Sequence, residues 1–346
     1  MSSYVHFENL PFLKKRSKRF RLISIAVVVI IVALVIGIPL GLRRRNDNDD
    51  DQDNNPNPTP TPQPQPPLPD PTSRPLWTPK VNDTWQIMLL HPPLISPNAT
   101  STSPDVAIFD VDLFNTPVET ISTLHRLGKK VICYFSAGSY EPGRPDSGQF
   151  KEEDMGAGLE GWPGERWLQL SSENVKRIMK NRIDLAWRKG CDGVDPDNVD
   201  GYNNKNALSL TTNTSTTYLT YLSSLTTPLN LTLGLKNAAS LIPTLLPIIH
   251  FSVNEQCVQY TECTAFAPFI AAGKPVFHIE YPEEAGAGKP DQGKGWGDNA
   301  IRKFCGESGD ARGRAGFSTV LKNMNLDGWS EYCEGGVRVT EMNMTV

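Results

Sequence analysis

Eight short runs rich in β-branched and aliphatic residues recur along the chain, and this series limits the folds that the sequence can adopt. Apolar stretches of four to six residues that end in polar ones are typical of parallel strands covered on both faces. The runs occupy residues 85–90, 106–112, 130–138, 193–200, 231–237, 251–257, 275–281 and 318–323. We therefore expect eight parallel strands.

The segments between these runs show helical spacing. Over residues 172–189, apolar side chains from Val175 to Trp187 recur on one helical face. A serine at position 171 or 172 can cap the start of this helix, and Gly190 can cap its end. The pattern predicts a long amphipathic helix that crosses from the third strand to the fourth.

Two weaker helices are predicted over residues 217–225 and 238–249, the second interrupted by Pro243 and Pro247. Eight strands that alternate with helices over about 250 residues match the usual size of a (β/α)8 barrel. We expect residues 80–346 to form an α/β domain of this TIM-type barrel class. A doubly wound open sheet is the alternative.

The N-terminal part predicts a membrane anchor. Residues 1–21 carry six basic side chains, and residues 22–42 contain no charge and are rich in Val, Ile and Leu. This stretch is long enough to span a hydrocarbon core of about 30 Å, and it lacks the cleavage site of a signal peptide. Residues 43–45 carry only three basic side chains, so the positive-inside rule places residues 1–21 in the cytoplasm. We expect a single-pass type II protein of the cell membrane with an extracellular domain.

Residues 43–79 have the composition of a disordered stalk. An acidic, Asn-rich run at 47–53 precedes eleven prolines within residues 56–79. Such a segment cannot bury enough apolar surface to fold, and its prolines favour an extended polyproline II conformation. We expect it to hold the globular domain away from the membrane.

Sequons and cysteines agree with export. Five N-x-[ST] sequons lie beyond the predicted anchor, at Asn82, Asn98, Asn213, Asn230 and Asn343. The six cysteines are an even number, which suits an oxidising compartment. The expected disulfides are Cys257–Cys263 and Cys305–Cys333, whereas Cys133 and Cys191 either pair or stay as buried thiols.

Composition and motifs exclude several classes of function. The 34 basic and 38 acidic side chains give a formal charge of −4, which argues against a nucleic-acid-binding protein. The histidines form no H-x-H or H-E-x-x-H pattern, and no G-x-S-x-G motif is present. The G-x-G-x-x-G sequence at 156–161 follows KEEDM and not a strand, so we interpret it as a flexible loop. No metal or cofactor is expected.

Polar side chains gather where the predicted strands end, which is where barrel enzymes hold their catalytic groups. Like charges at such density destabilise a fold, which suggests that they serve a function. The acidic residues at these ends are Asp110, Asp112, Asp195, Asp197, Glu255 and Glu280, and the other candidates are Trp85, Tyr134, Ser136, Lys236, Asn237 and Tyr281.

Glycoside hydrolysis fits this set best, because it needs two carboxylates that flank one bond. Aromatic residues such as Trp85, Tyr134 and Tyr281 can stack on sugar rings. A Schiff-base lyase that acts through Lys236 is a distant alternative, because surrounding carboxylates would keep this lysine charged. Another alternative is a cell-surface carbohydrate-binding barrel without activity, which would lack one of the two catalytic carboxylates.

The motifs WQIMLL, CYFSAGSYEPGR, GVDPDNVDGY, GLKN, NEQC and HIEY, in this order, resemble glycoside hydrolase family 114. This family comprises the endo-α-1,4-polygalactosaminidases, including membrane-anchored fungal members. The resemblance covers about residues 77–285. It implies Asp197 and Glu255 as the catalytic pair, with Asp197 as nucleophile, Glu255 as general acid/base and retention of configuration. The remaining candidates named above, from Trp85 to Tyr281, would then contact substrate.

The resemblance also implies a substrate, which is an α-1,4-linked galactosamine polymer that is at least partly deacetylated. A free amino sugar is cationic near neutral pH, so a carboxylate-rich groove would attract it. We therefore expect an extracellular catalytic domain that binds a cationic polysaccharide, needs no cofactor and acts as a monomer.

Overall fold

The computed structural model describes residues 74–284, 286 and 295–345. The predicted tail at 1–21, the anchor at 22–42 and most of the stalk at 43–79 lie outside these residues. Within the described part of the chain, no helix has the length and apolar character needed to cross a bilayer.

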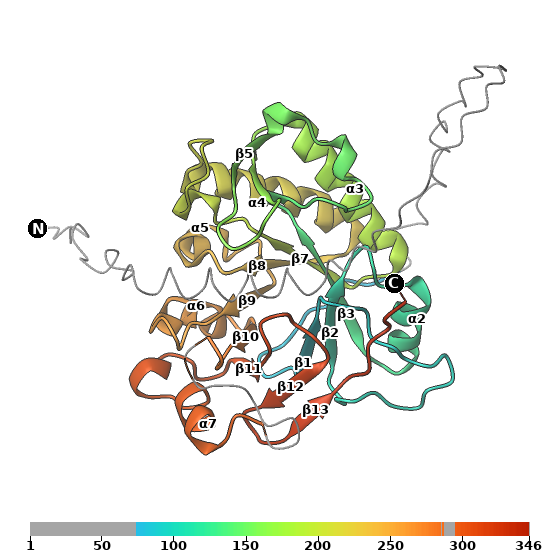
Figure 1. Cartoon of the computed structure of the whole chain (residues 1–346), viewed down its shortest axis with the longest axis vertical. Coiled ribbons are helices and arrows are strands. Elements are labelled where there is room, and N and C mark those ends of the chain that lie inside the picture. Colours follow the sequence, from blue (N-terminus) through green and yellow to red (C-terminus); the bar gives the residue numbers. More distant parts are fainter. Residues whose placement is uncertain (1–73, 285, 287–294, 346) are drawn as a thin grey trace, which may run out of the picture. The chain divides into compact units, whose positions relative to one another are not determined.

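The eight predicted strands are all present, each somewhat shorter than its sequence run. They lie side by side in chain order and every neighbouring pair is parallel (Figure 1). A doubly wound sheet would reverse its strand order at a switch point, so that alternative is wrong. The strands are β1 (Trp85–Met88), β2 (Ile108–Asp112), β3 (Lys130–Ser136), β7 (Gly193–Asp197), β8 (Thr232–Lys236), β9 (Phe251–Glu255), β10 (Val276–Glu280) and β11 (Ser318–Leu321).

The sheet curls so that its last parallel strand returns to its first. The Trp85 indole at the start of β1 donates a hydrogen bond to the Ser318 carbonyl of β11, with an N–O distance of 2.8 Å. Just beyond the carboxyl end of β11, the Lys322 ammonium lies 3.0 Å from the Oε1 atom of Gln86 in β1. The result is a mixed α/β fold with a curled sheet, consistent with a TIM-type barrel.

Two antiparallel strands that the sequence analysis did not predict extend the sheet to ten. Strand β12 (Trp329–Tyr332) pairs with β11, and β13 (Val337–Val339) pairs with β12. The Tyr332 hydroxyl donates to the Trp85 carbonyl at 2.9 Å, so this hairpin also reaches β1. It therefore reinforces the place where the curled sheet returns to its beginning.

Alternating side chains of the parallel strands fill two apolar layers, since successive residues of a strand point to opposite faces. The layer on the outer face packs against the helices, which surround the strands in Figure 1. The inner layer consists of residues from six strands: Trp85, Ile87, Ile108, Ile132, Phe251, Val253, Phe277, Ile279 and Val320, with Tyr281 above them.

The long predicted helix is confirmed as α3 (Glu173–Lys189). The Ser172 hydroxyl accepts hydrogen bonds from the backbone N–H groups of Asn174 and Val175, and Gly190 ends the helix with φ at 99°. The other helices are α2 (Val118–Arg126), α4 (Thr212–Thr226), α5 (Ile242–Leu245), α6 (Ala267–Ala271) and α7 (Asp298–Phe304).

Two helix boundaries differ from the prediction. Helix α4 begins five residues earlier than predicted, because Thr211 and Thr214 form a reciprocal capping box. The predicted helix at 238–249 shrinks to the four residues of α5 and a preceding 3-10 turn. Pro243 and Pro247 lack the N–H groups that a longer helix would need.

A small antiparallel sheet is inserted between β3 and α3. It consists of β4 (Ser139–Tyr140), β5 (Met155–Gly158) and β6 (Arg166–Leu168), in the order β4-β6-β5. The insertion follows the carboxyl end of β3, so it stands beside the ends of the neighbouring strands. The segment that was interpreted as a flexible G-x-G-x-x-G loop begins within β5.

All six cysteines pair. The predicted disulfides Cys257–Cys263 and Cys305–Cys333 are confirmed. The pair that the sequence left open also forms a disulfide, which joins Cys133 in β3 to Cys191 just beyond α3.

Candidate active site

Asp197, Lys236 and Glu255 are the last residues of the adjacent strands β7, β8 and β9. The Lys236 ammonium lies 3.3 Å from Asp197 Oδ2 and 3.5 Å from Glu255 Oε2. The two carboxylate oxygens are therefore no more than about 6.8 Å apart, which is the sum of these distances. The structure thus brings together the two carboxylates that the sequence resemblance implied, with a cation between them.

Sharp backbone turns directly after these three residues aim their side chains at one place. The residue that follows each strand has a left-handed backbone: Asn198 at φ 60°, Asn237 at φ 50° and Gln256 at φ 63°. Asparagine tolerates this region better than most residues, whereas glutamine enters it at a cost in strain. Each of these strands thus ends immediately after the residue that it presents.

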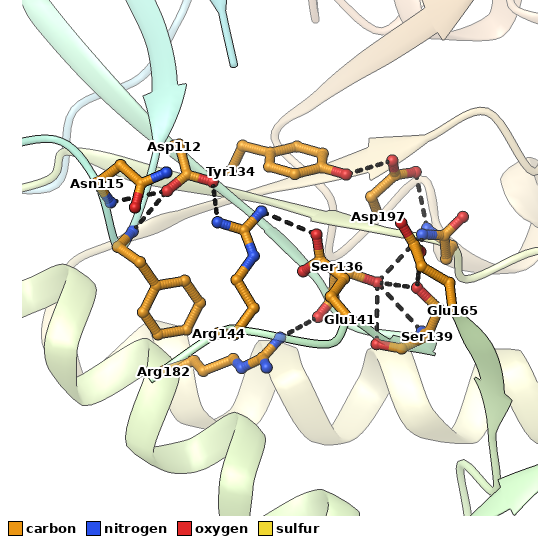
Figure 2. A network of polar contacts seen from close by, with 12 residues as sticks. Asp112, Asn115, Tyr134, Ser136, Ser139, Glu141, Arg144, Glu165, Arg182 and Asp197 are labelled. Carbon is orange, nitrogen blue, oxygen red and sulfur yellow. Dashed lines mark hydrogen bonds and ion pairs between the residues drawn. The ribbon is translucent and has the colours of Figure 1, made fainter. Parts of the chain in front are cut away.

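Each carboxylate also has a tyrosine of its own. The Tyr134 hydroxyl donates to Asp197 Oδ2 at 2.9 Å, as Figure 2 shows, and the Asn198 N–H donates to the other oxygen of Asp197 at 2.7 Å. The Tyr281 hydroxyl donates to Glu255 Oε1 at 2.6 Å. These contacts fix the orientation of both carboxylates before any ligand arrives.

Asn237 holds Glu255 from the neighbouring strand. Its amide Nδ2 donates to Glu255 Oε2 at 3.1 Å, and its Oδ1 accepts the backbone N–H of Glu255 at 2.9 Å. The structure therefore places Asn237 at the site, as predicted, but with its amide engaged by Glu255.

Lys236 remains charged although only 2% of its side chain is exposed. Burial by itself would lower its pKa, but the neighbouring carboxylates, chiefly Asp197 and Glu255, outweigh burial and raise the pKa above its usual value. A protonated lysine is not a nucleophile, so the Schiff-base alternative has no support here.

Asp110 and Asp195 lie one side-chain layer below the catalytic end of their strands, and both are fully buried. Within the described residues, no protein group donates a hydrogen bond to any of their four carboxylate oxygens. Burial raises the pKa of Asp195 to about 7, and burial together with Asp195 raises that of Asp110 well above its usual value. Burial therefore favours the neutral form of both carboxyls, and for Asp195 this holds below about pH 7.

Two predicted substrate contacts are instead occupied by the protein. Asp112 Oδ1 accepts the backbone N–H groups of Phe114 and Asn115, and Oδ2 lies 2.7 Å from Arg144 (Figure 2). Ser136, which is fully buried, bonds the hydroxyl of Ser139. These two residues organise the loop after β3.

Two other predicted residues lie away from Lys236. Glu280 accepts the Val258 N–H at 2.7 Å and bonds His278, and it alternates along β10 with residues of the inner layer. Glu280 therefore faces the outer side of the sheet, away from Lys236. Trp85 is buried at the amino end of β1, opposite the catalytic end, where its indole helps to join β1 to β11.

The structure adds residues that the sequence analysis missed. Glu165, in the insertion, accepts the Ser139 hydroxyl at 2.9 Å; burial, Glu141 and Asp197 raise its pKa to about 7 (Figure 2). Asp200 follows β7, and burial, with a contribution from Asp197, raises its pKa to about 6. No strand-end signal marks Glu165, because only the folded insertion brings it to the site.

One group of side chains has the residue types of a metal site. Cys257, Cys263 and His278 have ligand atoms within 4.8 Å of one another. The two cysteines are joined as a disulfide, so neither offers the thiolate that a metal prefers. This group therefore does not have the donor chemistry of a metal centre.

The architecture of the site is that of two fixed carboxylates at the end of a curled parallel sheet. A model of glycoside-hydrolase family GH114 matches residues 67–338. The chain belongs to glycoside-hydrolase family GH114. The resemblance seen in the sequence is thereby confirmed, and this GH114 chain is a glycoside hydrolase.

Solved structures agree with this assignment. The GH114 chain is similar to Aspergillus fumigatus Ega3, determined in complex with galactosamine, with 47% identity and a TM-score of 0.67 over 75% of this chain and 98% of Ega3. It also shares the fold of the glycoside hydrolase domain of PelA from Pseudomonas aeruginosa, with 12% identity and a TM-score of 0.53 over 70% of this chain and 95% of that domain. Comparison with curated proteins gives no match.

Proposed function

We propose that this GH114 chain is an endo-glycosidase that cleaves α-1,4-galactosaminidic bonds within a partly deacetylated galactosaminogalactan-type polysaccharide. The observation that carries the proposal is the pair of carboxylates, Asp197 and Glu255, held on either side of one buried ammonium. The 47% identity to Ega3, which binds galactosamine, supports the choice of sugar.

The proposed mechanism is double displacement with retention. Asp197 attacks the anomeric carbon while Glu255 gives its proton to the leaving oxygen; water then loses a proton to Glu255 and displaces Asp197. Retaining enzymes hold their carboxyls about 5–5.5 Å apart, and inverting enzymes about 6.5–9.5 Å. The two oxygens that face Lys236 lie at most about 6.8 Å apart, which is compatible with the retaining range.

The charge of the site supports a cationic substrate. Asp197, Glu255 and Asp200 are carboxyl groups at or beside the strand ends that face Lys236, and Glu165 lies near Asp197 with Arg144 as its nearby cation. An ammonium on the sugar would be attracted to this excess of acidic groups. Ionisation of Asp200 and Glu165 between about pH 6 and 7 would strengthen the attraction.

Conservative substitutions test the assignment. Asp197→Asn and Glu255→Gln are nearly isosteric, so we expect each to lower kcat by at least about 10³-fold while the unfolding temperature changes little. Product release from deacetylated galactosaminogalactan measures turnover, and NMR of the first product gives its anomeric configuration. Asp195→Asn is the matched control; it retains both catalytic carboxylates and should retain turnover.

The opposite pattern would place the nucleophile two residues earlier: Asp197→Asn active and Asp195→Asn inactive. A product of inverted configuration would rule out the retaining mechanism. Cleavage of fully acetylated polymer in preference to deacetylated polymer would contradict the role given to the ammonium of the substrate.

We further propose that the curled sheet closes as a (β/α)8 barrel, that it acts as a monomer, and that residues 22–42 anchor it to the cell membrane with residues 43–79 as its stalk. The composition of residues 1–79 supports this topology, in which the catalytic domain is extracellular. Protease protection in sealed membrane vesicles tests it. Digestion of the catalytic domain by a protease on the cytoplasmic side would refute the orientation.

Exposure distinguishes the sequons of the proposed glycoprotein. Asn82, Asn98 and Asn213 are exposed, whereas the Asn230 side chain is half-buried and donates to the Arg74 carbonyl at 2.9 Å. We expect glycans at the three exposed positions and much lower occupancy at Asn230. Mass spectrometry of glycopeptides measures each occupancy, and equal glycan at Asn230 would contradict the prediction.

A further inference from the structure

Lys236 contacts both catalytic carboxylates at nearly equal distances, 3.3 Å to Asp197 and 3.5 Å to Glu255. An ammonium that served only to hold the nucleophile ionised would need only the first contact. A cation also disfavours the protonated form of a neighbouring acid, so its place beside Glu255 requires a separate explanation.

The charge states of the two carboxyl groups during the proposed reaction supply this explanation. Before the first step, Asp197 is a carboxylate and Glu255 holds the proton. In the glycosyl-enzyme, Asp197 is a neutral ester and Glu255, which has given its proton to the leaving oxygen, is the carboxylate. One negative charge therefore faces Lys236 in both states, although it has moved from β7 to β9.

We propose that Lys236 is the shared counter-ion of both half-reactions, paired with Asp197 during glycosylation and with Glu255 during deglycosylation, without a change of its own position. The inference rests on the retaining mechanism proposed above. It makes Lys236 a positioning residue that acts through the two carboxylates and takes no proton in either step.

The surroundings of Lys236 suit this task. Its side chain is 2% exposed, so solvent screens the ion pairs little. The ammonium also lies 5.3 Å from the centroid of the Tyr134 ring, which restrains it from the β3 side. Tyr134 and Tyr281 each donate to only one of the two carboxylates, so Lys236 is the group that both share.

Other titratable groups near Lys236 do not take over the role of Asp197 and Glu255 as its charged partners. The groups that face it are Asp110 on β2, Tyr134 on β3, Asp195 and Asp197 on β7, Asp200 after β7 and Glu255 on β9. Burial raises the pKa of Asp110 well above its usual value, that of Asp195 to about 7 and that of Asp200 to about 6. At pH values below these raised pKa values, the charge opposite Lys236 therefore comes chiefly from Asp197 or Glu255.

The test is the pH dependence of kcat/KM for the full chain on deacetylated α-1,4-galactosamine oligosaccharides. The acid limb reports the nucleophile and the alkaline limb reports the general acid. Lys236→Met removes a cation that lies within 4 Å of both carboxyl groups. Because that cation favours the ionised form of each, its loss should move both limbs to higher pH, by roughly 1–3 pH units. Lys236→Arg retains the cation and should keep both limbs within about half a pH unit of the native chain.

Matched variants separate this effect from general damage. Lys236→Gln is measured beside Lys236→Met, so that loss of folding in one does not remove the test. Lys322→Met removes another fully buried lysine, which bonds Gln86 and the Asp327 carbonyl, and should leave both limbs in place. Tyr134→Phe should move only the acid limb and Tyr281→Phe only the alkaline limb.

Each contrary outcome has a distinct meaning. If Lys236→Met and Lys236→Gln lower the rate at every pH without moving the limbs, Lys236 only orients substrate and the proposal is wrong. If one limb moves alone, Lys236 serves a single carboxylate and the shared role is wrong. Turnover retained in Asp197→Asn or Glu255→Gln would refute the proposed function itself, whatever Lys236 does.

Discussion

At the scale of single residues, carboxyl groups that look alike in the sequence have different environments. Asp195 and Asp197 stand two residues apart on β7, yet Asp195 is fully buried while 19% of the Asp197 side chain is exposed. Asp197 receives hydrogen bonds from Tyr134 and Asn198, whereas no described protein group donates one to Asp195. Their different positions along one strand therefore give the two carboxyl groups different burial and different hydrogen-bond partners.

Burial of Asp195 makes stability depend on pH. Its pKa is about 7 in the folded chain and close to 3.8 when unfolded, so the native state holds an extra proton between these values and loses stability as pH rises from about 4 to 7. Asp195→Asn removes this loss. We expect the free energy of unfolding of the variant to exceed that of the native chain at pH 8 by roughly 2–4 kcal/mol. At pH 4 the two free energies should match.

Urea unfolding at the two pH values measures this difference. Asp105→Asn is the control, because its carboxyl is largely exposed beside Lys129 and should leave stability unchanged at both pH values. A destabilised Asp195→Asn at pH 8 would show that the charged form of Asp195 is favoured in the native state.

At the scale of elements, helix α3 supports the loop that carries part of the site. The Arg182 side chain is fully buried and pairs with both oxygens of Asp146 at 2.8 Å. The same guanidinium donates to the Ser136 carbonyl at 2.5 Å, as Figure 2 shows, and stacks near Phe114 and Phe150. One residue of α3 thus fixes both the end of β3 and the segment that follows it.

Removal of Arg182 should be costly. Arg182→Met leaves the Asp146 carboxylate without its partner and the Ser136 carbonyl without a donor, so we expect a loss of about 3–5 kcal/mol in the free energy of unfolding. Lys180→Met, on the same helix, breaks a half-exposed pair with Asp184 and should change stability by less than about 0.5–1 kcal/mol. Equal effects in thermal or urea unfolding would contradict the structural role of Arg182.

At the scale of the whole molecule, disulfides and the return of β11 to β1 hold distant parts of the chain together. Cys133–Cys191 closes a separation of 58 residues across β3, the insertion and α3, whereas Cys257–Cys263 closes only six. In the chain-entropy model, the longer loop restricts the unfolded chain more, by about 2 kcal/mol.

Paired alanine variants test this difference. We expect Cys133→Ala/Cys191→Ala to lose more stability than Cys257→Ala/Cys263→Ala, because the unfolded chain regains more freedom when the longer loop opens. Differential scanning calorimetry under non-reducing conditions measures both. Activity should fall more in the second variant, since Cys257 lies two residues from Glu255; a larger loss of stability there would contradict the loop-length argument.

The positions of the strands follow from local sequence, whereas the proposed catalytic pair came from the family resemblance of the motifs at two strand ends. Each strand has its own apolar run and its own polar end, and these signals require no knowledge of distant residues. Helix α3 could likewise be read from its spacing and caps. The boundaries that failed, such as that of α4, depend on a capping box that lies outside the apolar pattern.

Tertiary packing determines which of the predicted polar residues lie together at the candidate site. The same strand-end signal marked Asp112, Ser136 and Glu280, but Arg144, Ser139 and the backbone of Val258 engage them. Glu165 had no signal, because an insertion that is remote in sequence delivers it. A sequence lists donors and acceptors, whereas pairing depends on distance and burial. Those quantities exist only after the sheet curls and places Lys236 between Asp197 and Glu255.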